Sequence, residues 1–258
     1  MSKRVAISAG ANGIGRAIAE AYLAQGDKVY VCDLDEAALA SFAQEYPDVV
    51  AIKANAGDPE DVANFFAQIA GDEARLDVLV NNAGIAGPTA RLEDIDPTAW
   101  VETINVDLNS AFFFARHAIP MLRAAGGGSI VNIASNAAFF GFPMRSPYAS
   151  AKWGLIGLTK TMAMELGPEG IRVNAVCPGS VEGPRIDGVI ERDAVGRGMD
   201  RAAVEAEYKS QSSLRTFVSA AEVVGLVTYL TSDIGQRISG QAIGLDGHTE
   251  NLSLNIGN

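Results

Sequence analysis

The stretch RVAISAGANGIGRAIAEAYLAQG, residues 4–26, decides how the chain begins to fold. Residues 4–8 are mainly apolar and suit a buried strand, and a group of glycines follows them directly. Apolar side chains then recur at helical spacing from Ile18 to Leu23, and Gly26 stands where a helix commonly ends. The stretch therefore predicts a strand, a tight glycine turn and a helix in direct succession.

Strand-like runs recur along the rest of the chain. Six more segments rich in β-branched and apolar residues lie at 28–32, 49–53, 76–81, 129–134, 171–177 and 242–246. Most are apolar at consecutive positions, which is typical of strands covered on both faces in a parallel sheet. Segments with helical spacing lie between them, and Asp58-Pro59 opens one with a capping residue and a proline. The alternation predicts an α/β fold, a doubly wound parallel sheet with helices on both faces.

One segment departs from this alternation. Residues 183–213 are rich in Arg, Asp and Glu, and their one clear helical pattern begins near Arg201. A long insertion after a strand end is often a lid over a ligand, although a solvated helical excursion is the alternative. We interpret 183–213 as a substrate lid. No linker or composition shift divides the chain, so we expect residues 1–258 to form a single domain.

Composition excludes several classes of protein. The 258 residues are 48% hydrophobic, with 31 acidic against 20 basic residues and a formal net charge of -11. This apolar content suits a large core, and an acidic chain without a basic run is a poor partner for nucleic acid or anionic membrane. No apolar run approaches the roughly 20 residues that span a bilayer. We expect a cytoplasmic protein with small-molecule partners and with Cys32 and Cys177 as buried free thiols.

The glycine turn points to a dinucleotide. Gly13 and Gly15 flank Ile14 between the first strand and the first helix. Glycines here let the backbone turn tightly and approach a pyrophosphate, which the free N–H groups at the helix start stabilise. Asp33 ends the next strand, where its carboxylate can accept hydrogen bonds from the hydroxyls of an adenosine ribose.

The same carboxylate selects between the two nicotinamide cofactors. Asp33 would repel a 2′-phosphate, and the next residue, Leu34, brings no positive charge. The pattern therefore favours NAD over NADP. The alternative for Asp33 is a helix cap, because Asp35 and Glu36 begin a helix.

A second group of residues suits acid/base chemistry. Tyr148 and Lys152 are four residues apart in a segment with helical spacing, so they lie on one face. A free tyrosine, with a pKa of about 10, is a poor base, but an adjacent ammonium favours its phenolate. Ser135 ends the strand at 129–134, at the edge where ligands bind in open α/β sheets. The alternative is a surface tyrosine and a solvated lysine at ordinary helix spacing.

Five motifs in register resemble the short-chain dehydrogenase/reductase family. In the family's order and spacing they are SAGANGIG at 8–15, NNAG at 81–84, Ser135, YASAK at 148–152 and RVNAVCPG at 172–179. LDG at 245–247 is similar to the family's C-terminal signature, so the resemblance covers nearly the whole chain. It implies a seven-stranded Rossmann sheet, a nicotinamide cofactor, interconversion of alcohols and ketones, and commonly a homotetramer.

The resemblance also implies the cofactor contacts. By this resemblance, Asn12 and Ile14 would contact the phosphates and ribose, and Asn55 and Ala56 the adenine. Asn82 would contact the ribose on the nicotinamide side, and Gly179 and Val181 the carboxamide. With these, the predicted cofactor set comprises Ser8, Gly10, Gly13, Gly15, Asp33, Leu34, Tyr148 and Lys152. The predicted catalytic set is Ser135, Tyr148, Lys152 and Asp107, and we expect no metal.

Several positions depart from the family's pattern. Ser8-Ala9 replaces Thr-Gly, and we expect Gly10 to supply the flexibility that Ala9 lacks. Further departures are Asn55 for an Asp, Gly183 for a Thr that often bonds the carboxamide, and His248 for a glycine.

Asp107 departs most directly from the catalytic pattern. It replaces an Asn whose backbone, in the family, helps hold a water that relays protons to the lysine. An ionised aspartate cannot donate a hydrogen bond from its side chain but would stabilise the charge of Lys152. We expect Asp107→Asn to keep or raise activity. The alternative is a shifted register in which Asn105 or Asn109 substitutes.

Two arginines suggest an anionic substrate. Arg145 lies three residues before Tyr148, and Arg185 begins the 183–213 segment. Two guanidiniums can clamp a carboxylate or sulfonate, although pairing with Asp187 or Glu182 is the alternative.

These residues favour an NAD-dependent oxidoreductase that interconverts a secondary alcohol and a ketone. We expect its substrate to be a small polar or anionic hydroxy compound. The alternative is a nucleotide-binding regulatory protein on the same fold without turnover. Such a regulator would be free to lose Ser135, Tyr148 or Lys152, all of which are present.

Overall fold

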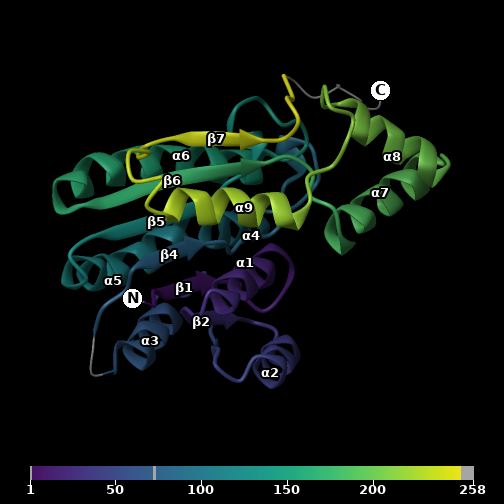
Figure 1. The fold of residues 1–258 in the computed structure, drawn as a ribbon. Helices are drawn as coiled ribbons and strands as arrows, with labels where there is room; N and C mark the ends of the chain where they lie inside the picture. Colours follow the sequence, from purple (N-terminus) through teal and green to yellow (C-terminus); the bar gives the residue numbers. More distant parts are fainter. Residues whose placement is uncertain (1, 72–73, 251–258) are drawn as a thin grey trace.

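Seven parallel strands form the centre of the molecule, in the order β3-β2-β1-β4-β5-β6-β7 (Figure 1). The computed structural model describes residues 2–71 and 74–250; the rest of the predicted domain lies outside these ranges. The strands are β1 (Arg4–Ser8), β2 (Lys28–Asp33), β3 (Val50–Lys53), β4 (Val78–Asn81), β5 (Gly128–Ile133), β6 (Ile171–Pro178) and β7 (Ala242–Leu245). All seven predicted strands are confirmed, and with them the doubly wound α/β fold.

Helices cover both faces of this sheet. They are α1 (Gly13–Ala24), α2 (Glu36–Glu45), α3 (Pro59–Ala70), α4 (Pro97–Ile104), α5 (Ser110–Ala124), α6 (Ser146–Leu166), α7 (Pro184–Arg197), α8 (Arg201–Ser210) and α9 (Ala220–Thr231). One apolar core joins the sheet to α3, α5 and α6, and a second joins its other face to α1, α2 and α9. In β1, Ala6 belongs to the first core while Val5 and Ile7 belong to the second. Consecutive apolar residues are therefore needed because both faces of each strand are buried.

The turn after β1 corrects one expectation. Ala9 itself adopts the left-handed conformation, with φ 50°, and Gly10 does not supply that flexibility. Gly10 is required for packing instead, since a Cβ atom there would lie 2.7 Å from Val31 of β2. A left-handed alanine is strained because its Cβ atom approaches the following carbonyl oxygen.

Ala9→Gly is therefore expected to raise the free energy of unfolding by about 0.5–1 kcal/mol, as relief of left-handed strain outweighs the added chain entropy. Urea denaturation at fixed protein concentration measures this. Ala11→Gly is the matched control: Ala11 is buried in the same turn and lacks a positive φ, so glycine there should destabilise. A destabilised Ala9→Gly protein would contradict the strain argument.

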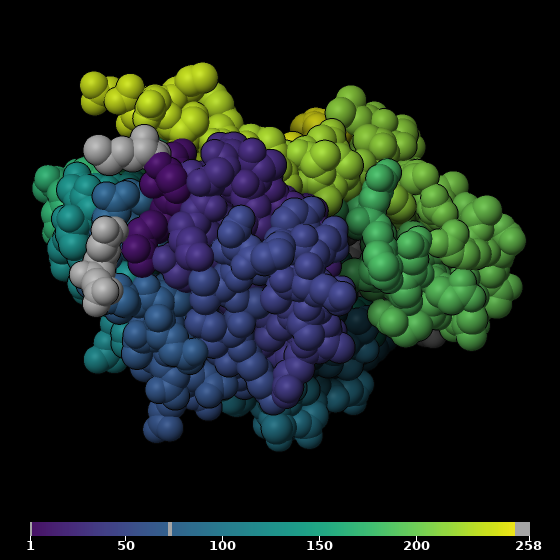
Figure 2. All heavy atoms as spheres, turned by 60° about the horizontal axis from the view of Figure 1, so that its bottom comes forward, coloured from purple at the N-terminus to yellow at the C-terminus, as the bar shows by residue number. Residues whose placement is uncertain are grey.

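The segment at 183–213 is a helical hairpin rather than a single helix. α7 precedes the predicted α8, and the pair projects past the end of the sheet (Figure 1) and forms a separate lobe in space-filling view (Figure 2). Ile190 and Ala194 of α7 pack on Val204 of α8 and on Phe217. The hairpin thus has a small core of its own.

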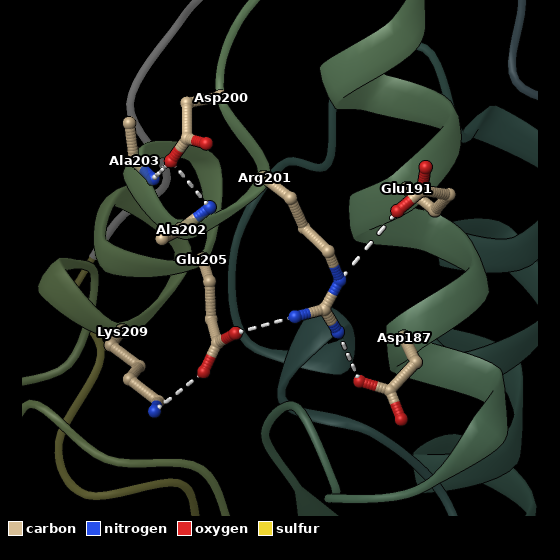
Figure 3. Close-up of polar contacts among 8 residues, drawn as sticks. All are labelled: Asp187, Glu191, Asp200, Arg201, Ala202, Ala203, Glu205 and Lys209. Carbon is tan, nitrogen blue, oxygen red and sulfur yellow. Dashed lines mark hydrogen bonds and ion pairs between the residues drawn. The ribbon is translucent and has the colours of Figure 1, made fainter.

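Ion pairs fasten the two helices together (Figure 3). Arg201 of α8 reaches Asp187 at 2.7 Å and Glu191 at 3.6 Å, both on α7. It also pairs with Glu205 at 3.1 Å, and Glu205 in turn accepts from Lys209 at 2.8 Å. Because the pairs share partners as a network, α7 and α8 are held as one unit.

Two further findings concern membrane spans and cysteines. Among residues 2–71 and 74–250, no helix combines the length and apolar character needed to cross a membrane. Cys32 and Cys177 are buried and free, and burial raises the pKa of each thiol to about 12.

Candidate active site

The predicted site residues gather where the strands end. Strand neighbours pair in parallel, so their carboxyl ends share one edge of the sheet, and the α7–α8 hairpin lies at that end (Figure 1). Ser8 and Asp33 end β1 and β2, Asn82 follows β4, and Ser135 follows β5. This edge is where open α/β sheets bind ligands.

The glycine turn forms a cradle for an anion. Gly13 has φ 54° and begins α1. A Cβ atom on Gly15 would lie 2.1 Å from the carbonyl oxygen of Ala9, so no side chain fits there. The side chain of Asn12 caps no N–H group of α1, and the first turn carries no acidic residue. The open N–H groups and the helix dipole therefore suit a pyrophosphate.

Asp33 is tied to this turn and does not cap the next helix. Its Oδ2 accepts from the backbone N–H of Ala11 at 3.1 Å, and its Oδ1 from that of Asp35 at 3.2 Å. The N-cap of α2 is Asp35, whose side chain accepts from Ala38. Asp33 keeps free lone pairs on both oxygens, as binding the two hydroxyls of a ribose requires. Leu34 beside it is 62% exposed.

A lysine that the sequence pattern does not reveal lies beside this carboxylate. Lys53 of β3 stands opposite Asp33 in strand register. Its ammonium is ion-paired with Glu36 of α2, which places a second carboxylate near the end of β2. Only pairing of β2 with β3 brings the residues together, so local sequence carries no signal of it.

The side chains of Ser8 and Asn82 form hydrogen bonds with backbone groups of the protein. The Ser8 hydroxyl oxygen accepts from the backbone N–H groups of Asn82 and Ala83, both at 3.0 Å. The Asn82 side-chain amide donates to the carbonyl oxygens of Ser8 at 3.2 Å and Ala9 at 2.9 Å. Both residues therefore fix the glycine turn against the end of β4.

The other residues predicted to contact the cofactor lie on neighbouring loops. Asn55 follows β3 and accepts from the N–H of Gly57 at 3.0 Å, and Ala56 beside it is buried. Gly179 follows β6, and a Cβ atom there would lie 2.9 Å from that of Asp246. Val181 forms a short parallel bridge with Val218 at the base of the hairpin.

The Tyr148 and Lys152 pair lies in the first part of α6. Lys152 is buried, and its ammonium donates to the carbonyl oxygen of Ile133, the last residue of β5, at 3.2 Å. Its Nζ lies 5.6 Å from the ring centroid of the half-buried Tyr148. Ser135 stands two residues beyond Ile133, and its hydroxyl accepts from Ala137 N–H at 3.1 Å. The end of β5 thus brings the serine and the lysine to one place.

Asp107 joins this group from a different helix. It lies in a π-helical turn, Asn105–Asn109, between α4 and α5. Its Oδ1 accepts from the backbone N–H of Ile85 at 2.7 Å, and its Oδ2 lies 4.0 Å from Lys152 Nζ. Asn109 donates to Asn105 at 2.7 Å, so these two residues pair with each other. The structure thus places Asp107 beside Lys152, as the unshifted register predicts.

Burial dominates the electrostatics of Asp107. Desolvation raises the pKa of its carboxyl group above the usual value, while the Lys152 ammonium and the Ile85 N–H group oppose that shift. Single π-helical turns inside α-helices are frequent at functional sites.

Arg145 stacks on the same tyrosine. Its guanidinium carbon lies 5.2 Å from the ring centroid of Tyr148 and 5.4 Å from that of Phe142. One nitrogen donates to the carbonyl oxygen of Ala86 at 2.5 Å, while the buried Nε has no hydrogen-bond partner. Burial lowers the pKa of Arg145, and the charge of Arg185 lowers it further.

Arg185 faces this cluster from the start of α7. It is exposed, and it forms no ion pair with any other described residue. The alternative partner Asp187 is bound to Arg201 instead. The structure therefore leaves Arg185 available for an anion, and it is near enough to Arg145 to lower the pKa of that residue.

The segment after β7 binds the chain that follows α8, at the end of the hairpin. His248 Nδ1 and the Ser213 hydroxyl are 2.8 Å apart, and Ser213 N–H donates to the carbonyl oxygen of His248 at 3.0 Å. Asp246 accepts from the His248 N–H at 3.0 Å. His248 therefore positions the base of the hairpin.

Comparisons with known proteins show which family the chain belongs to. A family model described as Enoyl-(Acyl carrier protein) reductase matches residues 8–248. The chain is similar to the D-beta-hydroxybutyrate dehydrogenase of Rhizobium meliloti (strain 1021), with 33% identity over 96% of this chain and 98% of that protein. It is 36% identical to the trans-4-hydroxycyclohexanecarboxylate dehydrogenase of Sinomonas cyclohexanicum, over 93% of this chain and 90% of that one. It is 32% identical to the cyclohexanol dehydrogenase of Acinetobacter sp. (strain SE19), over 95% of this chain and 94% of that protein. The chain is an oxidoreductase that belongs to the short-chain dehydrogenase/reductase family.

Proposed function

We propose that this protein is an NAD-dependent dehydrogenase that interconverts a secondary alcohol and a ketone, with Ser135, Tyr148 and Lys152 as its catalytic residues. The observation that carries the proposal is the buried ammonium of Lys152, anchored on the end of β5 beside the Tyr148 ring. A buried ammonium next to a phenol stabilises the phenolate, which makes the tyrosine an effective base.

The cofactor site fits NAD. The cradle at Gly13 and Gly15 would hold the pyrophosphate, and Asp33 would bind the adenosine ribose beside Leu34. When bound, NAD supplies the acceptor for the hydride. The negative charge of Asp33 opposes a 2′-phosphate, whereas Glu36 is neutralised by its ion pair with Lys53, and NAD is therefore proposed rather than NADP.

The chain's own residues handle the proton. Tyr148 takes it from the substrate hydroxyl during oxidation and returns it during reduction. Lys152 stabilises the phenolate, and the Ser135 hydroxyl holds the substrate oxygen beside Tyr148. The α7–α8 hairpin acts as the lid over the substrate, a role supported by its position at the carboxyl edge of the sheet (Figure 1).

An anionic hydroxy compound is the proposed substrate class. Arg145 stacks on Tyr148, and Arg185 is close enough to Arg145 to lower its pKa. Guanidinium groups bind carboxylates bidentately. Two relatives are named for hydroxy carboxylates, a hydroxybutyrate and a hydroxycyclohexanecarboxylate. We place the enzyme in the cytoplasm as a homotetramer. Large exposed apolar side chains on α4 to α6, namely Val101, Phe112, Trp153 and Met164, support self-association.

A matched substrate panel tests this proposal. With NAD, 3-hydroxybutyrate and 4-hydroxycyclohexanecarboxylate are compared with butan-2-ol and cyclohexanol, following absorbance of the reduced cofactor. We expect higher kcat/KM for the acids and little activity with NADP. Binding of NAD without turnover of any alcohol in the panel would favour the regulatory alternative.

Arg185→Ala should raise KM for the accepted acid about tenfold, because hydrogen bonds to charged groups contribute roughly 1.5–3 kcal/mol. Arg145→Ala should raise KM too and also affect kcat, since Arg145 stacks on Tyr148. Arg192→Ala is the matched control, an exposed arginine further along α7 without an ion pair among the described residues. Equal KM values in all three variants and wild type would exclude the clamp.

A further inference from the structure

We propose that the Asp107 carboxylate is a fixed counter-charge for Lys152, a positioning group that moves the working pH range of Tyr148 upward. The inference rests on the proposed function, in which Tyr148 is the base. It concerns a residue at which this chain carries a charge while the family pattern has a neutral amide.

The geometry of the pair is the first support. Exposed fractions of the side chains are 4% for Lys152 and 0% for Asp107, with 4.0 Å between Nζ and Oδ2. Asp107 Oδ1 is held by the Ile85 N–H group at 2.7 Å, which fixes the carboxylate plane. Oδ2 has no hydrogen-bond partner and is directed at the ammonium. The positive charge of Lys152 therefore compensates the negative charge of this buried oxygen.

The second support is that the local structure does not need a charge here. An asparagine oxygen would accept from the Ile85 N–H group equally well, because the two side chains have nearly the same shape. Only the second oxygen requires a cation. A carboxylate at this position therefore acts on Lys152 and, through it, on Tyr148.

Two arginines near the pair act in the opposite direction to Asp107. Arg145 stacks on the Tyr148 ring, and Arg185 approaches from α7. Tyr208 of α8 interacts with Arg145, and Cys177 of β6, near Lys152, is kept neutral by burial. Glu102 of α4 and Arg116 of α5 are exposed, and His117 of α5 stacks on Phe66. Asp246 after β7 is half-buried, acts on Cys177 and accepts from Asn136 at 3.5 Å. Asp107 is fully buried, and its charge opposes that of the two arginines.

The sign of the effect follows from charge alone. An anion beside Lys152 weakens the stabilisation that the ammonium gives to a phenolate. Alcohol oxidation needs the phenolate, so its rate rises with pH as Tyr148 ionises. Replacing Asp107 by a neutral residue should therefore move this rise to lower pH.

Asp107→Asn tests the inference by two measurements. The pH profile of kcat/KM for alcohol oxidation should move down by about one pH unit, the scale of charge effects between close groups. Absorbance titration of the phenol in cofactor-free protein, taken as the difference from the matching Tyr148→Phe protein, should move equally. Glu93→Gln removes an exposed charge in the short 3₁₀ helix Leu92–Asp94 and should leave both unchanged.

The two readouts separate this inference from the proposed function. A shifted phenol titration in a protein that oxidises no alcohol would keep the inference and overturn the function. Active enzymes with unchanged profiles and titrations would overturn the inference and keep the function.

We expect the Asp107→Asn protein to fold. Burial raises the pKa of the Asp107 carboxyl group, so the folded state is destabilised as pH rises through that pKa. Asp107→Asn should then be at least as stable as wild type near pH 7. The advantage should vanish at pH values below about 4, where an unfolded aspartate also binds its proton. A strongly destabilised variant would indicate a structural role and overturn the inference.

Discussion

Tyr148→Phe is expected to lower kcat for alcohol oxidation by about 10³- to 10⁴-fold, because a positioned general base contributes up to about that factor. The ring itself should stay in place. Phe142 packs edge-on at 6.4 Å between centroids, and Lys152 and Arg145 lie over the ring, contacts that phenylalanine retains. The loss should therefore fall on the chemical step, with the affinity for NAD unchanged when measured by calorimetry.

Tyr22→Phe is the matched control for this loss. Tyr22 is fully buried in α1, and its hydroxyl bonds that of Thr231 at 2.7 Å. Removing that bond should cost about 1 kcal/mol of stability but leave kcat unchanged, since Tyr22 packs in the core away from the site. Turnover in Tyr148→Phe within tenfold of wild type would remove the phenol from the mechanism.

The fold could be predicted because its signals are local. Each strand needs apolar residues at consecutive positions, and Val5, Ala6 and Ile7 show why, as they alternate between the two cores. Tyr148 and Lys152 were equally accessible, since four residues along α6 place both on one face.

What the sequence did not reveal depends on contacts between distant segments. α7 contains Gly188 and Gly196, which weaken its helical pattern, and it is stabilised by packing and ion pairs with α8. The left-handed Ala9 is imposed by the turn around it, where Asn82 binds its carbonyl oxygen. Such residues have no periodicity to reveal them.

The site combines both kinds of information. The carboxylate at 107 is visible in the sequence as a departure from the family. Its orientation toward Lys152 depends on the π-helical turn and on the Ile85 N–H group. Charge at the site is thus set by residues from α6, the π-helical turn and α7, which only the folded chain brings together.

Cofactor choice gives the second large effect. Asp33→Ser combined with Leu34→Arg should raise the ratio of kcat/KM for NADP over NAD by about 10³-fold. Two contributions of roughly 2 kcal/mol each give that factor: lost repulsion of the 2′-phosphate and a new charge-assisted hydrogen bond. Leu34 is exposed, so an arginine there can reach a phosphate without disturbing the core. Both ratios are measured at a saturating concentration of one alcohol.

Asp33→Asn separates charge from shape in this prediction. The amide oxygen can still accept from the Ala11 N–H group, which Asp33 binds at 3.1 Å, so the glycine turn should keep its conformation. The amide nitrogen cannot accept, so the bond from the Asp35 N–H group is lost. We expect this variant to move the ratio by about thirtyfold, the factor that corresponds to roughly 2 kcal/mol, as it removes repulsion without adding a cation. Lys53 stays paired with Glu36 in both variants, so its charge is not the source of any gain. A ratio that stays at the wild-type value in the double variant would mean that the carboxylate at the end of β2 does not face the ribose, and NAD specificity would then need another residue.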